Sequence, residues 1–275
     1  MPLRLAFESA RSTLFTVGLV AKKRIFLEQA IWKTAPWQGS GLPPKTAQNE
    51  LVDIMVGIPG YMQDTVEIQQ GGAKDKQKKA LLLARLKADL STLFDWRWKW
   101  EAHNPNAAIE MEPGALPVGR RVCDFRLFRK VLWFRNFTQA TEILLYNAVL
   151  LCLLGALWQF DPPAEVEVPA PTNSILKRPD EIFSLLEPAE EICRGFEYQL
   201  LNIDNSQDST LFWLLPLGVA SKVLEAEPEY GRWIQSMLDT SRVTRGYGSG
   251  MSEFAFGHYQ FPHIGHARKR RMRDR

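Results

Sequence analysis

Cysteine is scarce in this chain of 275 residues, which has only Cys123, Cys152 and Cys193. The three are far apart, form no CxxC pair and are odd in number, which argues against a framework of disulfides. The N-terminus lacks an apolar stretch behind a basic segment, so we predict no secretory signal. Together these absences indicate a reducing compartment.

The short motifs of common enzyme classes are also missing. The sequence has no P-loop, no GxGxxG after a strand, no GxSxG, no HExxH and no DDxxD-like acidic cluster. We therefore predict that the chain is not an enzyme and has no catalytic, cofactor-binding or metal-binding residues. The alternative is an enzyme or small-molecule-binding protein whose site is assembled from residues that sequence cannot bring together.

Positive charge is concentrated at the C-terminus. The formal net charge is +3, but the tail Ala267–Arg275 has six Lys or Arg and one Asp, so the other 266 residues sum to −2. A slightly acidic body is a poor match for a broad phosphate-binding surface. The tail fits a nuclear-import signal or a solvated end, and less well a nucleic-acid contact or a membrane-surface patch.

The longest apolar run, 137–160, lies near the middle of the chain. Between Ile143 and Trp158 only Tyr146, Asn147 and Gly155 interrupt the apolar residues. A helix that is apolar around most of its circumference must be enclosed by protein or lipid. Its sixteen-residue centre would rise about 24 Å, short of a hydrocarbon layer of about 30 Å. We predict the central helix of a soluble helical domain.

Helical spacing recurs along the rest of the chain, and we predict an all-α fold, an irregular multi-helix bundle around the central helix. The first helix, 3–21, has an apolar stripe at Leu3, Phe7, Ala10, Leu14, Val17 and Ala21. A long helix, 78–100, has a core face at Leu82, Leu86, Leu90, Leu93 and Trp100, with Trp96 close to it. Further helices are predicted at 25–32, 46–58, 182–186, 188–201, 209–224 and 228–240.

Long loops rich in Pro and Gly separate these helices. They are predicted at 39–44, 101–119 and 161–180. The aromatic and basic segment 122–134 fits a strand or a helix about equally well. In the overlapping segment 125–137, Phe125, Phe128, Leu132 and Arg135 follow helical spacing, so packing beside the central helix is favoured over a nucleic-acid platform.

A few residues invite a functional interpretation. Glu190 and Glu191 follow Pro188, and we interpret them as acids that stabilise the first turn of a helix. His258, His263 and His266 lack a Cys or Asp at metal-ligand spacing, so a polar loop is favoured over a metal site. Cys152 and Cys193 are predicted to be small core residues.

An ordered set of motifs runs along most of the chain. They are Lys22-Lys-Arg-x-Phe-Leu27, Trp32-Lys-Thr-x-Pro-Trp37, Pro44-Lys-Thr46, Leu51-x-Asp-Ile-x-x-x-Ile-Pro-Gly60, Tyr146, Ile192-Cys-Arg194 with Tyr198, and Leu214-Leu-Pro-Leu-Gly-Val-Ala220. Together they resemble the C-terminal regulatory domain of the fungal-specific transcription factor family, and the similarity spans roughly 7–246.

The resemblance implies an all-helical domain that usually follows a zinc cluster of six Cys and two zinc ions. This chain has no such cluster, so no zinc or DNA-contact residue carries over. It is then a shortened regulator, a regulator without the cluster, or a domain put to another use. The resemblance implies action in the nucleus through self-association, protein partners or a small effector. We assign 1–255 to the regulatory domain and 256–275 to a basic, disordered tail.

The motif residues themselves are expected to fix packing and loops. Trp32 and Trp37 should bracket a turn, and Lys45 or Arg194 should form structural ion pairs.

We predict no sequence-specific DNA binding by this chain alone at physiological salt. Phosphate contacts from the six basic tail residues would give only weak, steeply salt-dependent affinity. Deleting 267–275 should abolish this weak DNA affinity, as measured by fluorescence anisotropy in a salt titration. A tight and sequence-selective complex of the isolated chain would contradict the prediction.

Overall fold

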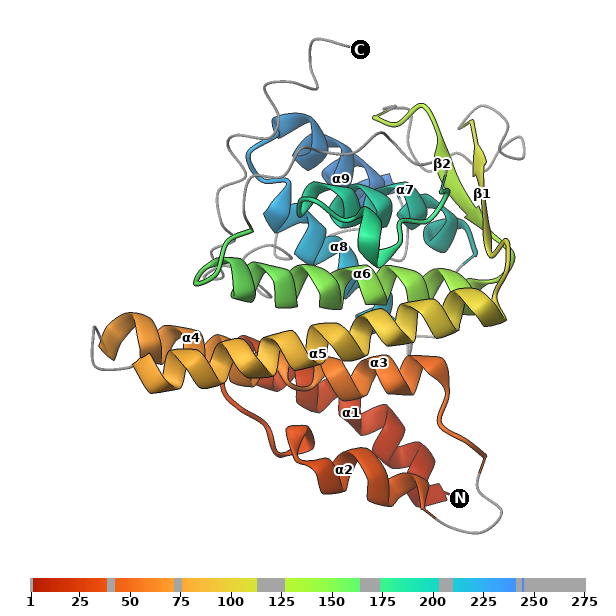
Figure 1. The fold of residues 1–275 in the computed structure, drawn as a ribbon. Helices are drawn as coiled ribbons and strands as arrows, with labels where there is room; N and C mark the ends of the chain where they lie inside the picture. The colour runs from red at the N-terminus through yellow and green to blue at the C-terminus, as the bar shows by residue number, and fades with distance from the viewer. Residues whose placement is uncertain are drawn as a thin grey trace.

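Two long helices, α5 (Lys76–His103) and α6 (Phe137–Trp158), run side by side through the middle of the molecule (Figure 1). The computed structural model describes residues 2–38, 43–71, 76–112, 127–163, 174–202, 210–240 and 244. The fold is mostly helical, as predicted, and the described part of the chain adds two short strands.

The remaining elements lie on the two sides of this central pair (Figure 1). The N-terminal side has α1 (Pro2–Ala21), α2 (Ala30–Thr34), α3 (Ala47–Met55) and α4 (Ile58–Gly71). The C-terminal side has α7 (Leu186–Asn202), α8 (Thr210–Val223) and α9 (Pro228–Thr240). Turns of 3-10 helix occur at Phe26–Glu28, Ala35–Trp37 and Pro179–Glu181, and the strands are β1 (Ala108–Met111) and β2 (Val131–Phe134).

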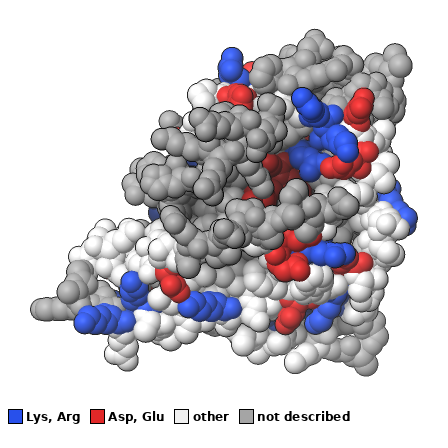
Figure 2. Space-filling model, turned by 45° about the horizontal axis from the view of Figure 1, so that its top comes forward, with Lys and Arg blue, Asp and Glu red and all other residues white. Residues whose placement is uncertain are grey.

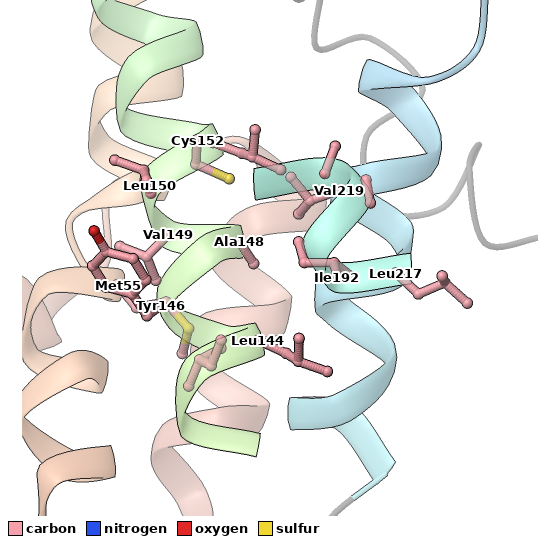
Figure 3. Packing of buried hydrophobic residues seen from close by; sticks show 14 of the residues in the cluster. Met55, Leu144, Tyr146, Ala148, Val149, Leu150, Cys152, Ile192, Leu217 and Val219 are labelled. Carbon is pink, nitrogen blue, oxygen red and sulfur yellow. The ribbon is translucent and has the colours of Figure 1, made fainter. Parts of the chain in front are cut away.

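Helix α6 is the centre of the core, as its apolar circumference predicts. Asn136 caps its first turn, where the Asn136 side chain accepts a hydrogen bond from the Gln139 N–H at 2.9 Å. Every residue from 140 to 157 is buried. In Figure 3, Leu150 and Tyr146 point toward Met55 of α3, while Ala148 and Cys152 face Ile192 of α7 and Val219 of α8. Each buried Leu contributes about 1.5–3 kcal/mol.

Among the described helices, α6 is also the one long and apolar enough to span a bilayer. The most apolar part of the helix is nevertheless entirely enclosed by the protein. Such enclosure is typical of the core helix of a globular protein.

The predicted core face of α5 is confirmed. Its six predicted residues, including Trp96 and Trp100, are all buried. Trp98, on the other face, is 43% exposed, and the Arg178 guanidinium lies 5.9 Å from the centre of its ring. The helices predicted at 209–224 and 228–240 are also present.

The apolar stripe predicted for the first helix is confirmed only in part, at Phe7 and Leu14, which pack against the core. Val17 is 60% exposed, whereas Phe15 and Leu19 are buried. The buried face also includes Arg11, which is 1% exposed because it pairs with Asp53 of α3. Since a buried ion pair cannot be read from apolar spacing, the stripe was placed partly on a neighbouring face.

One further prediction is corrected by the hairpin of β1 and β2. Residues 108–111, predicted as loop, pair antiparallel with 131–134, where a strand and a helix fitted the sequence about equally well. Ala108 pairs with Phe134, and Met111 pairs with Val131. The two segments are about twenty residues apart, so local spacing carries no signal of their pairing.

Helix boundaries also differ from prediction at two places. Residues 182–186 are not a separate helix, because α7 itself begins at Leu186 and Pro188 is its third residue. Pro188 is tolerated there since the first turn of a helix needs no N–H donor. The predicted helix 25–32 is instead a 3-10 turn followed by α2.

Close packing of α7 on α6 depends on Gly195. A Cβ at this position would lie 2.9 Å from Leu144 Cδ2 and 3.2 Å from Phe134 Cε2. We expect Gly195→Ala to lower the free energy of unfolding by about 1–2 kcal/mol, because overpacking outweighs the gain in helix propensity.

Gly231 of α9 provides the matched control, since a Cβ there would meet nothing within 4 Å. Gly231→Ala should raise the free energy of unfolding by about 0.5–1 kcal/mol. Urea denaturation of both variants measures the difference. Equal effects of the two substitutions would show that α7 does not depend on Gly195 for its approach to α6.

Candidate functional site

Several residues that the sequence singled out lie outside the described part of the chain. These are Cys123, His258, His263, His266 and the tail 267–275. Their interpretations remain predictions. Cys152 and Cys193 are core residues, as predicted, and burial raises the pKa of Cys152 to about 12 and that of Cys193 further. A thiol with so high a pKa is a poor nucleophile.

The interpretation of Glu190 and Glu191 as first-turn acids is wrong for both, because the acid in the first turn of α7 is Glu187. Helix α7 starts five residues before it, and the Glu191 side chain points into the core, where it is 2% exposed. Glu190 faces the other way and accepts a hydrogen bond from the Tyr230 hydroxyl at 2.6 Å. The error arises because the helix begins earlier than its Pro indicates.

Glu191 belongs to a buried group that we call the core polar cluster: Arg97, Tyr146, Asn147 and Glu191. Asn147 Nδ2 of α6 donates to Glu191 Oε1 of α7 at 2.8 Å. The Arg97 guanidinium of α5 is 1% exposed, and Arg97 Nη1 donates to Glu101 Oε2 at 2.9 Å. The cluster thus joins the three helices at the middle of the core.

The core polar cluster also holds the segment 174–181 against the helices. The Lys177 N–H donates to Glu191 Oε2 at 2.7 Å, and the Lys177 carbonyl accepts from Arg97 Nη2 at 3.3 Å. Arg178 Nη2 donates to Glu101 Oε1 at 2.6 Å. Both backbone polar groups of Lys177 are therefore satisfied by buried charges, which fixes the segment between α5 and α7.

The electrostatics of the core polar cluster fit a structural role. Burial raises the pKa of Glu191, and the hydrogen bonds from Lys177 and Asn147 offset this only in part. Burial also raises the pKa of Tyr146. Arg97 Nε, Tyr146 Oη and Asn147 Oδ1 are buried and find no partner among the described residues. Buried polar groups of this kind are typically bridged by internal water.

A second group lies between α1 and α3, and we call it the Trp37 cluster: Arg4, Arg11, Trp37, Lys45 and Asp53. Three cations lie over the Trp37 ring, with Lys45 Nζ at 4.4 Å, Arg11 Cζ at 4.9 Å and Arg4 Cζ at 5.8 Å from its centre. The Asp53 carboxylate binds both Arg11 and Lys45. This confirms the predicted structural ion pair of Lys45.

Phe7 of α1 contacts Trp32 and Trp37, the two tryptophans of the second motif. The Phe7 ring stacks on Trp32 with centres 5.9 Å apart and meets Trp37 edge-on at 5.8 Å. A turn separates the two tryptophans, as predicted, because α2 ends at Thr34 and the 3-10 turn Ala35–Trp37 follows.

A third group, which we call the Arg24 cluster, consists of Arg24, Glu28, Asp64 and Arg85. Arg24 binds Glu28 and, through Nη2, both Asp64 oxygens at 2.7 and 2.8 Å. Arg85 Nη1 binds Asp64 Oδ2 at 3.0 Å. Gly60 of α4 lies against this cluster, and a Cβ there would meet Glu28 Oε2 at 2.5 Å and Arg24 Nη1 at 3.1 Å.

Arg194 of α7 forms the other predicted structural ion pair. Arg194 Nη2 binds Glu110 Oε1 of β1 at 2.5 Å, and Arg194 Nε donates to the Lys130 carbonyl at 3.2 Å. Tyr198, one turn further, meets Trp133 of β2 edge-on at 4.9 Å. These contacts attach the hairpin to α7.

No group of three His, Cys, Asp or Glu within the described residues is placed to hold a metal ion. Arrangements of charge are the main chemical features of the described part. On the face in Figure 2, several Lys and Arg side chains lie next to Asp or Glu. Of the three charged groups, the Trp37 cluster has more cations than carboxylates.

Glu191→Gln tests the core polar cluster. Glu191 accepts hydrogen bonds from Asn147 Nδ2 and from the Lys177 N–H. In the variant, the amide NH₂ would face one of these two donors, so we expect the free energy of unfolding at pH 7 to fall by about 1–3 kcal/mol. The raised pKa means that the folded protein holds this proton more tightly than the unfolded chain. The stabilising contribution of wild-type Glu191 is therefore complete below the ordinary pKa of 4.5 and declines as pH rises through the folded pKa.

Urea denaturation between pH 4 and pH 8 measures this effect as the difference between wild type and variant, which should shrink as pH rises. Glu190→Gln is the control, since its amide oxygen still accepts from Tyr230, and it should change neither stability nor slope appreciably. A difference between wild type and Glu191→Gln that is constant with pH would rule out the assigned titration.

Comparison with known proteins adds no assignment, because no protein-family model, no curated protein and no solved structure matches the chain. The order of the sequence motifs and the contacts among their side chains are what bear on function. The polar groups of the core polar cluster bind one another and the backbone of Lys177, whereas the Trp37 cluster has more cations than carboxylates.

Proposed function

We propose that the chain is a transcription-regulatory and interaction domain of the fungal-specific transcription factor type, which acts in the nucleus through self-association, protein partners or a small effector. It has no DNA-binding zinc cluster of its own, so it does not select a DNA sequence. The observation that carries the proposal is that the separate N-terminal motifs of the resemblance contact one another.

The first and fourth motifs meet at the Arg24 cluster. Arg24 comes from Lys22-Lys-Arg-x-Phe-Leu27, and Gly60 ends Leu51-x-Asp-Ile-x-x-x-Ile-Pro-Gly60. A Cβ at Gly60 would displace the Glu28 carboxylate from its ion pairs with Arg24 and Arg85. Only glycine allows the start of α4 to lie this close to the charged pair.

The second, third and fourth motifs meet at the Trp37 cluster. Lys45 Nζ lies over the Trp37 ring, binds Asp53 and donates to the Lys33 carbonyl at 2.6 Å. Trp37 and Lys33 belong to the second motif, Lys45 to the third and Asp53 to the fourth. Chance matches scattered along a sequence would have no reason to converge in this way, so the convergence supports the motif set as one structural unit.

The charge distribution supports a domain that binds something other than nucleic acid. The body of the chain sums to −2 without its tail. Many of the described cations pair with carboxylates, as in the Arg24 cluster, and both signs occur on the face in Figure 2. Interspersed charge gives no stripe along which a phosphate backbone can lie.

A reporter assay in a fungal host tests the proposal. The full chain is fused to an unrelated DNA-binding domain, and transcription from a reporter with matching sites is compared with that of the DNA-binding domain alone. We expect the fusion to be nuclear and to change reporter output. Gly60→Ala should reduce the effect because it disturbs the motif contacts, whereas Gly231→Ala should leave it unchanged.

Immunoblots of both variants separate a loss of function from a loss of protein. Reporter output equal to that of the DNA-binding domain alone, with the fusion present in the nucleus, would refute the regulatory role.

A second candidate, a helical small-molecule-binding protein, is favoured by one observation. The Trp37 cluster has more cations than carboxylates and contains buried N–H donors for which the described residues supply no acceptor.

A further inference from the structure

The charges of the Trp37 cluster do not balance. Arg4 Nε is paired with Glu8 Oε1 at 2.9 Å. Arg11 and Lys45 share the single carboxylate of Asp53, one oxygen each. Three cations therefore face two carboxylates, and the surplus is one positive charge.

The hydrogen-bond donors of the cluster are likewise in excess. Trp37 Nε1 and Arg11 Nε are both buried and have no acceptor among the described residues. The Lys45 ammonium has three N–H groups, of which Asp53 and the Lys33 carbonyl take two. Burial lowers the pKa of Arg11, and the carboxylates of Asp53 and Glu8 offset only part of this.

The Arg24 cluster, on the same side of the molecule, shows what a balanced arrangement looks like. Two cations, Arg24 and Arg85, face two carboxylates, Glu28 and Asp64. Its one buried atom without a hydrogen-bond partner among the described residues is Glu28 Oε2, which is an acceptor and forms an ion pair with Arg85 at 3.7 Å. Unmet donors together with surplus positive charge therefore distinguish the Trp37 cluster.

The Trp37 cluster is accessible from solvent. The side chains of Lys45, Asp53 and Arg4 are 21%, 16% and 10% exposed, whereas that of Arg11 is 1% exposed. Solvent therefore reaches parts of Lys45, Asp53 and Arg4, whereas Arg11 is enclosed.

We propose that the Trp37 cluster binds the oxyanion group, a carboxylate or a phosphate, of a small ligand. An oxyanion offers several acceptor lone pairs to N–H donors, and its charge balances the surplus cation. Charge-assisted hydrogen bonds of this type are the strong ones in proteins. The proposed site can exist whether or not the chain regulates transcription. Its test measures binding to the purified full chain and needs no transcription readout.

Isothermal titration and thermal unfolding of the full chain test the proposal with sodium phosphate and sodium acetate as probes, and sodium chloride as the reference at equal ionic strength. We expect saturable heat and a saturable rise of the unfolding temperature with phosphate, with acetate or with both. Response to phosphate alone identifies a phosphate ligand, and response to acetate alone identifies a carboxylate ligand. Failure of both probes to exceed chloride would overturn the proposal.

Two variants place the binding at the cluster. Lys45→Met removes the surplus charge, and Trp37→Phe removes the Nε1 donor while keeping an aromatic ring. Each should weaken the probe by about tenfold, as expected for loss of a charge-assisted contact. Using both keeps the test decisive if one of them does not fold.

Matched controls make the same changes elsewhere. Lys222→Met removes a lysine that is 13% exposed and paired with Glu225, and Trp98→Phe changes a tryptophan that also lies under an arginine. Both should bind the probe as the wild type does. Equal affinity of wild type, Lys45→Met and Trp37→Phe would locate any binding elsewhere and overturn the proposal.

Discussion

Enclosure of α6 is the constraint on which the rest of the structure depends. A helix with apolar side chains all round its circumference is stable in water only when neighbours cover every side. Helices α3, α4 and α5 cover it from the N-terminal part of the chain, and α7, α8 and β2 from the C-terminal part. One contiguous core therefore runs from Phe15 to Leu238, and neither part can bury its own apolar face without α6.

The few polar side chains of α6 determine which residues of the neighbouring helices pack against it. An unpaired polar group in this core costs free energy, so a hydrogen bond from a polar side chain of α6 favours one particular residue of the neighbouring helix. Glu142 accepts from Trp100 Nε1 of α5 at 2.8 Å, and Asn147 donates to Glu191 of α7 at 2.8 Å. Apolar contacts tolerate sliding, whereas these bonds hold at one register only, so they select a single packing of α5 and α7 on α6.

Sequence was a good guide where a helix is long and strongly periodic, as in α5, α6, α8 and α9, because apolar spacing alone determines the buried face. It failed where a distant partner decides. Arg11 is buried because Asp53, 42 positions away, neutralises it, and this turned part of the predicted stripe of α1 onto the wrong face. Residues 108–111 become a strand only because 131–134 lie beside them. The sequence predicts Glu191 as a first-turn acid, because its partners Asn147 and Lys177 are distant along the chain.

The position of the Trp37 cluster gives binding there a direct connection to the core. Lys45 immediately precedes Thr46, which caps α3 by accepting from the Asn49 N–H at 3.2 Å. The next carbonyl, that of Ala47, accepts from Trp96 Nε1 of α5 at 3.0 Å, and the Trp96 ring stacks on Tyr146 of α6 at 5.7 Å. Since close-packed cores transmit strain, an anion that moved Lys45 would shift the start of α3 against Trp96 and thereby against α6. Two contacts, that of Ala47 with Trp96 and that of Trp96 with Tyr146, thus connect the segment beside the Trp37 cluster to α6.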